Sequence, residues 1–201
     1  MRAASHKDLA VALARRQGVA RARDFDAVGV PRVTLRRLTR EGVLISPARG
    51  YYQLAGAELS GTHSLAEAAQ AAPTGVVALL SALQFHRLTT QTPHQVWMLL
   101  PSNAWAPRNP PVSLKIIRAN AKVLAAGVER HLIEGVSVAM TSPAKTIADC
   151  FKHRSKVGFD VALEALREAV HRKRATADDI WRFAVIDRVG NVMRPYLEGI
   201  A

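Results

Sequence analysis

The sequence has one cysteine and no long apolar run, and both absences narrow the class of protein. With only Cys150, no intramolecular disulfide can form and a zinc site built on several thiolates is excluded. Cys150 follows Ile147 and Ala148 in an apolar pattern, which favours a buried small hydrophobic residue over a nucleophile. No run of about 18 apolar residues could span a bilayer, and the first residues lack the apolar centre of a signal peptide. We therefore expect a cytoplasmic protein without a membrane partner.

Catalytic motifs are also missing. The sequence has no P-loop, no G-x-G-x-x-G, no G-x-S-x-G and no H-E-x-x-H. Ser142 and Lys145 satisfy S-x-x-K, but an N-cap serine explains this spacing better because the partner motifs of that chemistry are absent. Asp149 and Asp160 are interpreted as isolated acids, and no two histidines are spaced i,i+4 for a helical metal site. We expect no enzymatic activity, no catalytic residue, no metal and no cofactor.

Positive charge is what the sequence has in excess. The formal net charge is +12 and the sequence pI is about 10.8, which points to nucleic acid or to an acidic protein or membrane surface. Residues 1–55 hold 11 Lys or Arg against 4 Asp or Glu, giving +7, and residues 56–201 hold 17 against 12, giving +5. Charge is therefore concentrated near the N-terminus.

The most informative stretch runs from Pro31 to Leu54. With Pro31 at the first helical position, a helix over 31–41 places Leu35 and Leu38 on one narrow apolar face. Four arginines fall on the opposite arc: Arg32, Arg36, Arg37 and Arg40. Gly42 is placed to end the helix, and Val43–Ile45 and Tyr51–Leu54 are predicted to form two strands of a hairpin with Arg49 at its tip. This order is typical of the second half of a winged helix-turn-helix.

An ordinary solvated helix face is the alternative interpretation of the arginine run. No acidic residue lies between Arg32 and Arg40 to form i,i+4 pairs, and like charges at that spacing repel, so we favour an anionic partner. In a winged helix the third helix enters the major groove while the wing holds phosphates. The sequence does not show which arginine contacts which base.

The rest of the chain predicts two domains of the α+β class, rich in helix. Residues 7–17 and 20–27 are predicted as the first two helices of a winged helix-turn-helix domain over 1–55. Residues 56–64 are small and polar and are predicted to form a linker. Residues 65–201 are predicted to form a mixed domain. Its helices are expected at 65–72, 76–88, 142–154, 159–172, 176–188 and 189–197, and its small sheet of about four strands at 95–100, 112–118, 128–133 and 136–140.

The expected helix over 76–88 carries two further expectations, one for its first two residues and one for His86 near its end. Strand pairing is left open as an alternative for Val76 and Val77. His86, at the end of an apolar helix, is expected to be a packed or capping histidine rather than a ligand.

Two segments resemble the AbiEi family, the antitoxins of type IV toxin-antitoxin systems. They are GVLISPARGYYQLA at the wing and TSPAKTIADCFKHRSKVGFDVALEALREAV further on, and the resemblance extends over nearly the whole chain. It implies a repressor that binds double-stranded DNA at inverted repeats in its own promoter and counters a nucleotidyltransferase-like toxin. The DNA-contacting positions that follow from it are Arg32, Thr34, Arg36, Arg37, Arg40 and Arg49, to which we add Tyr51 on the wing.

Two other functions stay open. The C-terminal basic residues, including Lys152, Arg154, Lys156 and the run at 172–174, could bind an acidic toxin directly, although a solvated helix end is an equal explanation of that run. A nuclease or transferase is disfavoured because no Asp or Glu is followed two residues later by lysine.

Overall fold

The structure is a computed structural model that describes residues 5–56 and 61–200. The chain divides into two compact units. The first comprises the described residues up to Pro73 together with 107–112 and 132–138, and the second comprises 74–106, 113–131 and the described residues from Ala139 onward. Residues 57–60 of the expected linker lie outside the described residues. The α+β class is confirmed, with one small sheet and one larger sheet among many helices.

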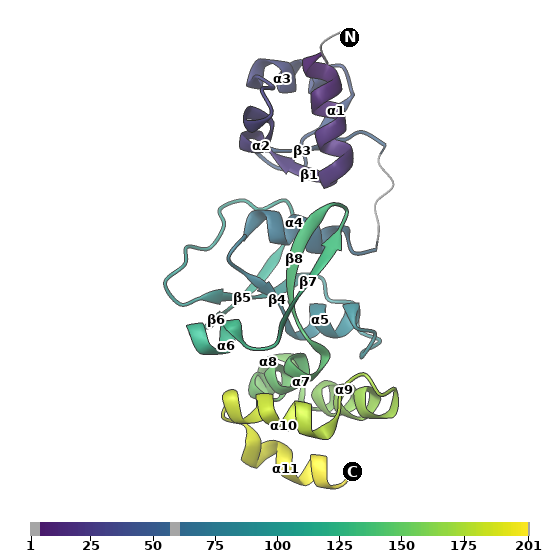
Figure 1. Ribbon diagram of the computed structural model, residues 1–201, viewed down its shortest axis with the longest axis vertical. Coiled ribbons are helices and arrows are strands. Elements are labelled where there is room, and N and C mark those ends of the chain that lie inside the picture. The colour runs from purple at the N-terminus through teal and green to yellow at the C-terminus, as the bar shows by residue number, and fades with distance from the viewer. Residues whose placement is uncertain (1–4, 57–60, 201) are drawn as a thin grey trace. The chain divides into compact units, whose positions relative to one another are not determined.

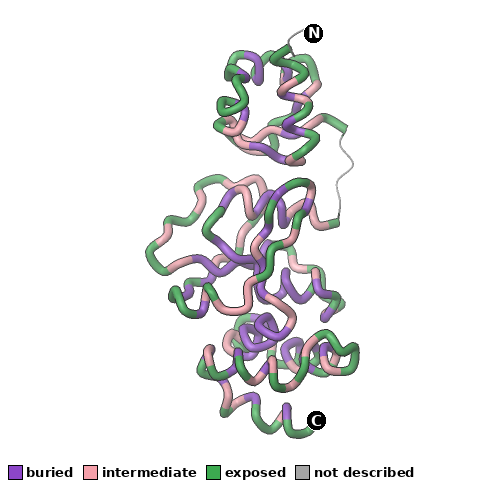
Figure 2. The backbone as a smooth tube through the Cα atoms, in the orientation of Figure 1, coloured by how far each residue is buried: buried purple, intermediate pink, exposed green. Residues whose placement is uncertain are grey.

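The first unit begins with three helices and a three-stranded sheet of order β1-β3-β2 (Figure 1). These elements are α1 (His6–Gln17), β1 (Val19–Arg21), α2 (Ala22–Ala27), α3 (Arg32–Arg40), β2 (Leu44–Ile45) and β3 (Tyr51–Leu54). Ser5 caps α1 in a capping box with Asp8. The core lies between the helices and the sheet (Figure 2). Its buried members are Ala10, Leu13, Ala14, Ala20, Phe25, Val30, Leu35, Leu38 and Leu44.

Two expectations for this domain were wrong in detail. The second helix does not start at residue 20, because Ala20 lies in β1 and pairs with Tyr52 of β3 in antiparallel register. Ala20 is fully buried. Its strand, β1, is the third strand of the wing sheet. Pro31 is the N-cap of α3 rather than its first residue, with an extended ψ of 148°. Gly42 at φ +71° follows the end of α3, as expected.

The elements after β3 are a mixed five-stranded sheet and further helices, and of these α4 (His63–Ala71) and residues 132–138 are counted with the first unit. The strands of the sheet are β4 (Val76–Val77), β5 (Val96–Pro101), β6 (Leu114–Ala119), β7 (Val128–Ile133) and β8 (Val136–Thr141). The other helices are α5 (Leu79–Phe85), α6 (Ala121–Ala125), α7 (Pro143–Lys152), α8 (Arg154–Val157), α9 (Phe159–His171), α10 (Ala177–Ile186) and α11 (Gly190–Glu198). The sheet order is β6-β5-β4-β8-β7, with β5 parallel to β6 and β4 antiparallel to β5.

The sheet has five strands rather than about four, because Val76 and Val77 form its central strand. The expected helix over 76–88 was wrong at its start, and the strand alternative for these two valines is confirmed. Both are buried, so they lack the alternation that identifies a half-buried strand. The helix α6 was not predicted at all. It has five residues, which is too short to show a helical period.

Several C-terminal expectations are confirmed. Ser142 caps α7 by accepting a hydrogen bond from the Lys145 amide at 3.4 Å, with Pro143 at the first helical position. Thr176 caps α10 by accepting from the Asp179 amide at 3.1 Å. Cys150 is fully buried on α7, which packs against α5, α9 and α10. Among the described residues, no helix is both long enough and apolar enough to cross a membrane.

Candidate nucleic-acid interface

Helix α3 has two sharply different faces. Leu35 and Leu38 are fully buried against the core, and Thr34 beside them is 7% exposed. The other face carries only exposed side chains: Arg32, Val33, Arg36, Arg37 and Arg40. At about 100° per residue these five positions span roughly 140° of the helix surface. Burying the two leucines therefore directs four guanidinium groups outward together, as the sequence predicts.

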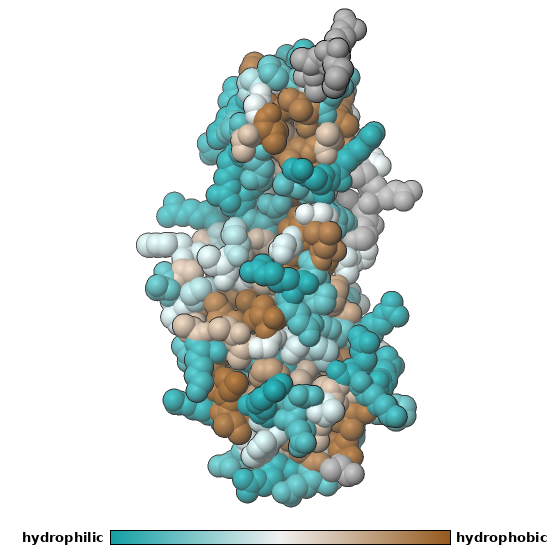
Figure 3. Space-filling view, viewed as in Figure 1, coloured by the Kyte–Doolittle hydropathy of each residue, from teal (hydrophilic) through white to brown (hydrophobic). Residues whose placement is uncertain are grey.

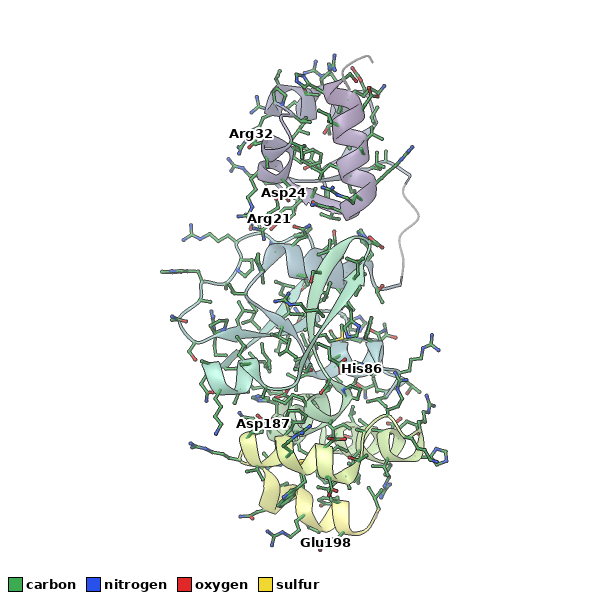
Figure 4. The ribbon with its side chains drawn as sticks, in the orientation of Figure 1. Arg21, Asp24, Arg32, His86, Asp187 and Glu198 are labelled. Atoms are coloured by element: carbon green, nitrogen blue, oxygen red, sulfur yellow. The ribbon has the colours of Figure 1, made fainter. Side chains whose placement is uncertain are left out.

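The four arginines differ in their partners. Arg32 donates to Asp26 of α2 at 3.1 and 3.2 Å, and Figure 4 labels Arg32 on the outer side of the domain. Arg37 lies 3.7 Å from Glu41 just beyond the helix end. Arg36 and Arg40 form no ion pair or hydrogen bond with any side chain in the described part of the chain. The acids that the sequence places outside the arginine run thus compensate Arg32 and Arg37, whereas Arg36 and Arg40 have no carboxylate partner among the described residues.

The wing is held close to the start of α2. Its turn at 46–50 follows β2, and the Gly50 carbonyl accepts a hydrogen bond from the Ala22 amide at 2.9 Å. Arg49 in this turn is exposed. Tyr51, the first residue of β3, is half-buried with the Arg21 guanidinium 5.6 Å from its ring centre. Arg49 in the wing therefore has no ion pair among the described residues, while Tyr51 is engaged within its own domain.

The comparisons with known proteins bear on this segment. Residues 8–55 match the family described as "Transcriptional regulator, AbiEi antitoxin". This segment, residues 8–55, is similar to the AbiEi antitoxin family and is called the AbiEi domain below. The matched range contains α2, α3 and both strands of the wing, so the arginine face lies inside the AbiEi domain. The match supports a role as an antitoxin and transcriptional regulator.

One solved structure extends the fold comparison to the rest of the chain. The RV2827C protein from Mycobacterium tuberculosis superposes with a TM-score of 0.60 over 96% of this chain and 80% of that chain. The two sequences are 14% identical, so this likeness shows the fold alone. A search of curated proteins gives no match.

Not all of the expected contact residues of the AbiEi domain face the same way. Thr34 points into the domain, roughly opposite the arginine face, and is left out of the interface proposed below. Val33, which the sequence interpretation passed over, is 72% exposed among the arginines. The helical periodicity alone contained this signal, since Val33 lies two residues before Leu35 and is therefore turned well away from the buried face.

A buried ionic cluster lies in the second unit, away from the AbiEi domain in sequence. The Lys145 ammonium donates to Asp149 one turn along α7 and to Asp187, labelled in Figure 4, at 3.0 and 3.3 Å. Lys145 and Asp149 are fully buried and Asp187 is 3% exposed. Asp149 is thus not the isolated acid that was expected. Burial raises the pKa of Asp149 to about 7, the Lys145 charge opposes this shift, and the Asp187 charge adds to it.

This cluster is interpreted as structural rather than catalytic. The Lys145 ammonium pairs with both carboxylates inside the helical layer, while Asp149 Oδ2 is buried without a hydrogen-bond partner among the described residues. The Ser142 hydroxyl is used as a helix cap. No group of three or more His, Cys, Asp or Glu side chains in the described ranges could hold a metal ion. His86 is a buried C-cap whose Nε2 lies 2.8 Å from the Thr141 carbonyl, which confirms the packed-histidine expectation, and burial lowers its pKa.

The basic C-terminal residues are partly paired. Arg172 contacts Glu168 one turn earlier on α9 and donates to the Arg87 carbonyl at 3.2 Å, while Lys152 lies 3.6 Å from Asp187. Arg172 and Arg87 follow the C-terminal ends of α9 and α5, where cations are favourable. Hydrophilic side chains cover much of the face in Figure 3, with hydrophobic residues in separate patches. Structural stabilisation thus explains part of this charge.

Proposed function

We propose that this protein is an antitoxin that represses its own operon by binding promoter DNA through α3 and the wing. The observation that carries the proposal is the free arginine pair, Arg36 and Arg40, on the exposed face of an amphipathic helix in an AbiEi domain. Arginines without carboxylate partners are suited to phosphates and to guanine, whose O6 and N7 accept bidentate hydrogen bonds. Arg32 and Arg37 would also bind DNA, after giving up their ion pairs with Asp26 and Glu41.

The proposed mechanism has two steps. The +7 charge of residues 1–55 first attracts the duplex, and Arg49 in the wing holds a phosphate while α3 enters the major groove. Readout at the inverted repeats of the promoter then fixes the position of the protein, and its occupancy blocks transcription. The test is a selection of duplexes from a random-sequence library, followed by binding assays on the enriched duplex and on DNA upstream of the gene. Recovery of an enriched sequence also present upstream would support autorepression, whereas enrichment of none would contradict it.

Salt dependence provides a quantitative prediction. If about five or six phosphates are neutralised, the slope of log affinity against log salt should be about −5. Fluorescence anisotropy of the enriched duplex at several salt concentrations measures this slope. Arg49→Ala should reduce its magnitude by about 1 while weakening all sequences alike, because Arg49 is assigned to a phosphate. A slope near zero would be incompatible with the proposed docking.

We further propose that the toxin is nucleotidyltransferase-like, as in a type IV system, and that the C-terminal domain contributes to neutralising it. Direct capture is the second candidate. It is favoured by Lys173 and Arg174, which are exposed at the end of α9 without an ion pair among the described residues. Co-expression of the chain with the neighbouring gene product, followed by co-purification, separates the two routes. Rescue of growth without co-purification would support indirect antagonism, and loss of both with Lys173→Glu and Arg174→Glu would support capture.

Neutralisation is proposed to need no catalysis by this chain. Ser142→Ala should lower the free energy of unfolding by about 1 kcal/mol, because only the N-cap hydrogen bond of α7 is lost. Toxin neutralisation and repression should remain at the level of the parent protein. Thr176→Ala, which removes the equivalent cap of α10, is the matched control. Loss of neutralisation with Ser142→Ala but not with Thr176→Ala would contradict the proposal and would indicate a nucleophilic serine.

A further inference from the structure

Val33 is an apolar side chain on the arginine face of α3 in the AbiEi domain. It is 72% exposed, and it lies at the second position of α3. With about 100° per residue, its direction is roughly 20° from Arg40, 40° from Arg37 and 60° from Arg36. Its two methyl groups are therefore within the arc formed by the guanidinium groups, near the middle of the exposed face.

The folded protein by itself gives no reason for a valine here. The core contacts of α3 are made by Leu35 and Leu38, so Val33 gains nothing from burial in the described structure. Valine also has lower helix propensity than arginine or alanine because its side chain loses rotational freedom in a helix. The same restriction favours recognition, because the helix already holds both valine methyl groups in one direction. Binding therefore costs little additional side-chain entropy.

The major groove offers one apolar group that fits such a side chain. The C5-methyl of thymine projects into that groove, whereas the other base edges there present hydrogen-bond donors and acceptors. Residues near the N-terminal end of a recognition helix are those that contact base edges, and Val33 occupies that part of α3. The surrounding arginines would bring this position against the groove floor while they bind phosphates and guanine.

We propose that Val33 is a specificity-determining residue that contacts the methyl group of a thymine in the operator. This inference rests on the proposed function, because it assumes that α3 enters the major groove. It assigns a different task to each kind of residue on the face. The arginines supply most of the affinity, and Val33 supplies discrimination between thymine and the other pyrimidine at one base pair of each half-site.

The test compares duplexes that differ by one methyl group. The duplex enriched from the random-sequence library is resynthesised with each thymine replaced, one at a time, by deoxyuridine, which lacks only the C5-methyl. Wild-type protein should lose about three- to tenfold in affinity at one thymine per half-site and little at the others. Val33→Ala should bind the thymine duplex about as weakly as wild type binds the uracil duplex, and the same replacement should then have no further effect.

Two controls make the result decisive. Val33→Thr keeps one methyl group at the same branch point and should retain part of the discrimination, and thermal melting should show that both variants fold, since the position is exposed. Equal sensitivity to the uracil replacement in wild type and Val33→Ala, or no methyl effect at any thymine, would overturn the assignment. In that case binding that still depends on Arg36 and Arg40 would leave the proposed function intact. Failure to enrich any duplex would overturn both.

Discussion

Replacing Arg36 and Arg40 together by alanine should weaken binding to the enriched duplex about 100-fold. These are the two arginines of α3 with no carboxylate partner among the described residues, so no internal pair must be broken before they meet DNA. Each contact of an arginine with a phosphate or, in bidentate form, with a guanine contributes about 1–3 kcal/mol to binding. The loss of two such contacts corresponds to a loss of affinity of about 100-fold. Fluorescence anisotropy at fixed salt measures the affinity. The fold should be retained, because alanine favours helix and neither side chain is buried.

A matched variant separates this effect from a general loss of charge. Arg15→Ala with Arg16→Ala removes the same two charges from exposed positions in the last turn of α1. We expect this double variant to weaken binding by less than about tenfold, through long-range electrostatics alone. Equal losses in the two double variants would show that α3 has no special role.

A second comparison is internal to α3. Arg32→Ala with Arg37→Ala should weaken binding less than the change at Arg36 and Arg40. Each of these two arginines already interacts with an acid, Asp26 or Glu41, and must give up that interaction on binding. The reverse order would indicate that the ion pairs position these guanidinium groups for DNA rather than compete with it.

Lys145→Met should produce a large loss of stability. It leaves Asp149 and Asp187 facing each other in a buried site without the ammonium that joins them. Breaking a buried pair in this way costs about 3–5 kcal/mol, or roughly 10 °C in melting temperature for a chain of this size. Urea unfolding at pH 8 measures the change. A loss below about 1 kcal/mol would show that the cluster contributes little to stability.

Lys152→Met is the control for this prediction. Lys152 lies on the same helix and 3.6 Å from the same Asp187, but its side chain is 31% exposed. Because solvent screens such a pair, its removal should cost less than about 1 kcal/mol. Adding Asp149→Leu to Lys145→Met should recover part of the loss by removing one of the two uncompensated carboxylates.

The pH dependence of the same cluster follows from the raised pKa of Asp149. A carboxyl group whose pKa is about 7 in the folded protein and near 3.8 when unfolded holds its proton more tightly in the folded state. Its contribution to stability is therefore fully present below about pH 4 and is lost as the pH rises toward 7. Removing Lys145 takes away the charge that lowers this pKa, so the cost of Lys145→Met should be smaller at pH 5.5 than at pH 8. Equal costs at both values would contradict this assignment.

The local sequence pattern predicted those parts of the fold that depend on interactions between residues close together in the sequence. Helical spacing of leucines, a glycine after α3 and hydroxyl caps before α7 and α10 act within a few residues, and each is found as expected. Strand β1 was not predicted, and β4 was only the alternative interpretation of Val76 and Val77, because the formation of both strands depends on distant partners. β1 exists by pairing with β3, and β4 by insertion between β5 and β8, and three- or two-residue strands carry no period of their own.

The same distinction applies to the candidate site. The outward arc of arginines follows from the periodicity of α3, but the pairing of Arg32 with Asp26 depends on the angle between α2 and α3. The Lys145 cluster joins residues 42 positions apart, so no spacing rule could have placed Asp187 beside the i,i+4 pair on α7. Burial of Thr34 was recoverable from helical geometry, since its direction lies about 100° from Leu35 and 40° from Leu38.

Chemical interference on the enriched duplex tests most directly whether the exposed face of α3 contacts DNA in the major groove. Dimethyl sulfate methylates guanine at N7, which lies in the major groove, and adenine at N3, which lies in the minor groove. Methylation of specific guanines at N7 should prevent binding of the wild-type protein, and this interference should disappear in the variant with alanine at positions 36 and 40. Interference confined to adenine N3, or an unchanged N7 pattern in that variant, would contradict the proposed interface.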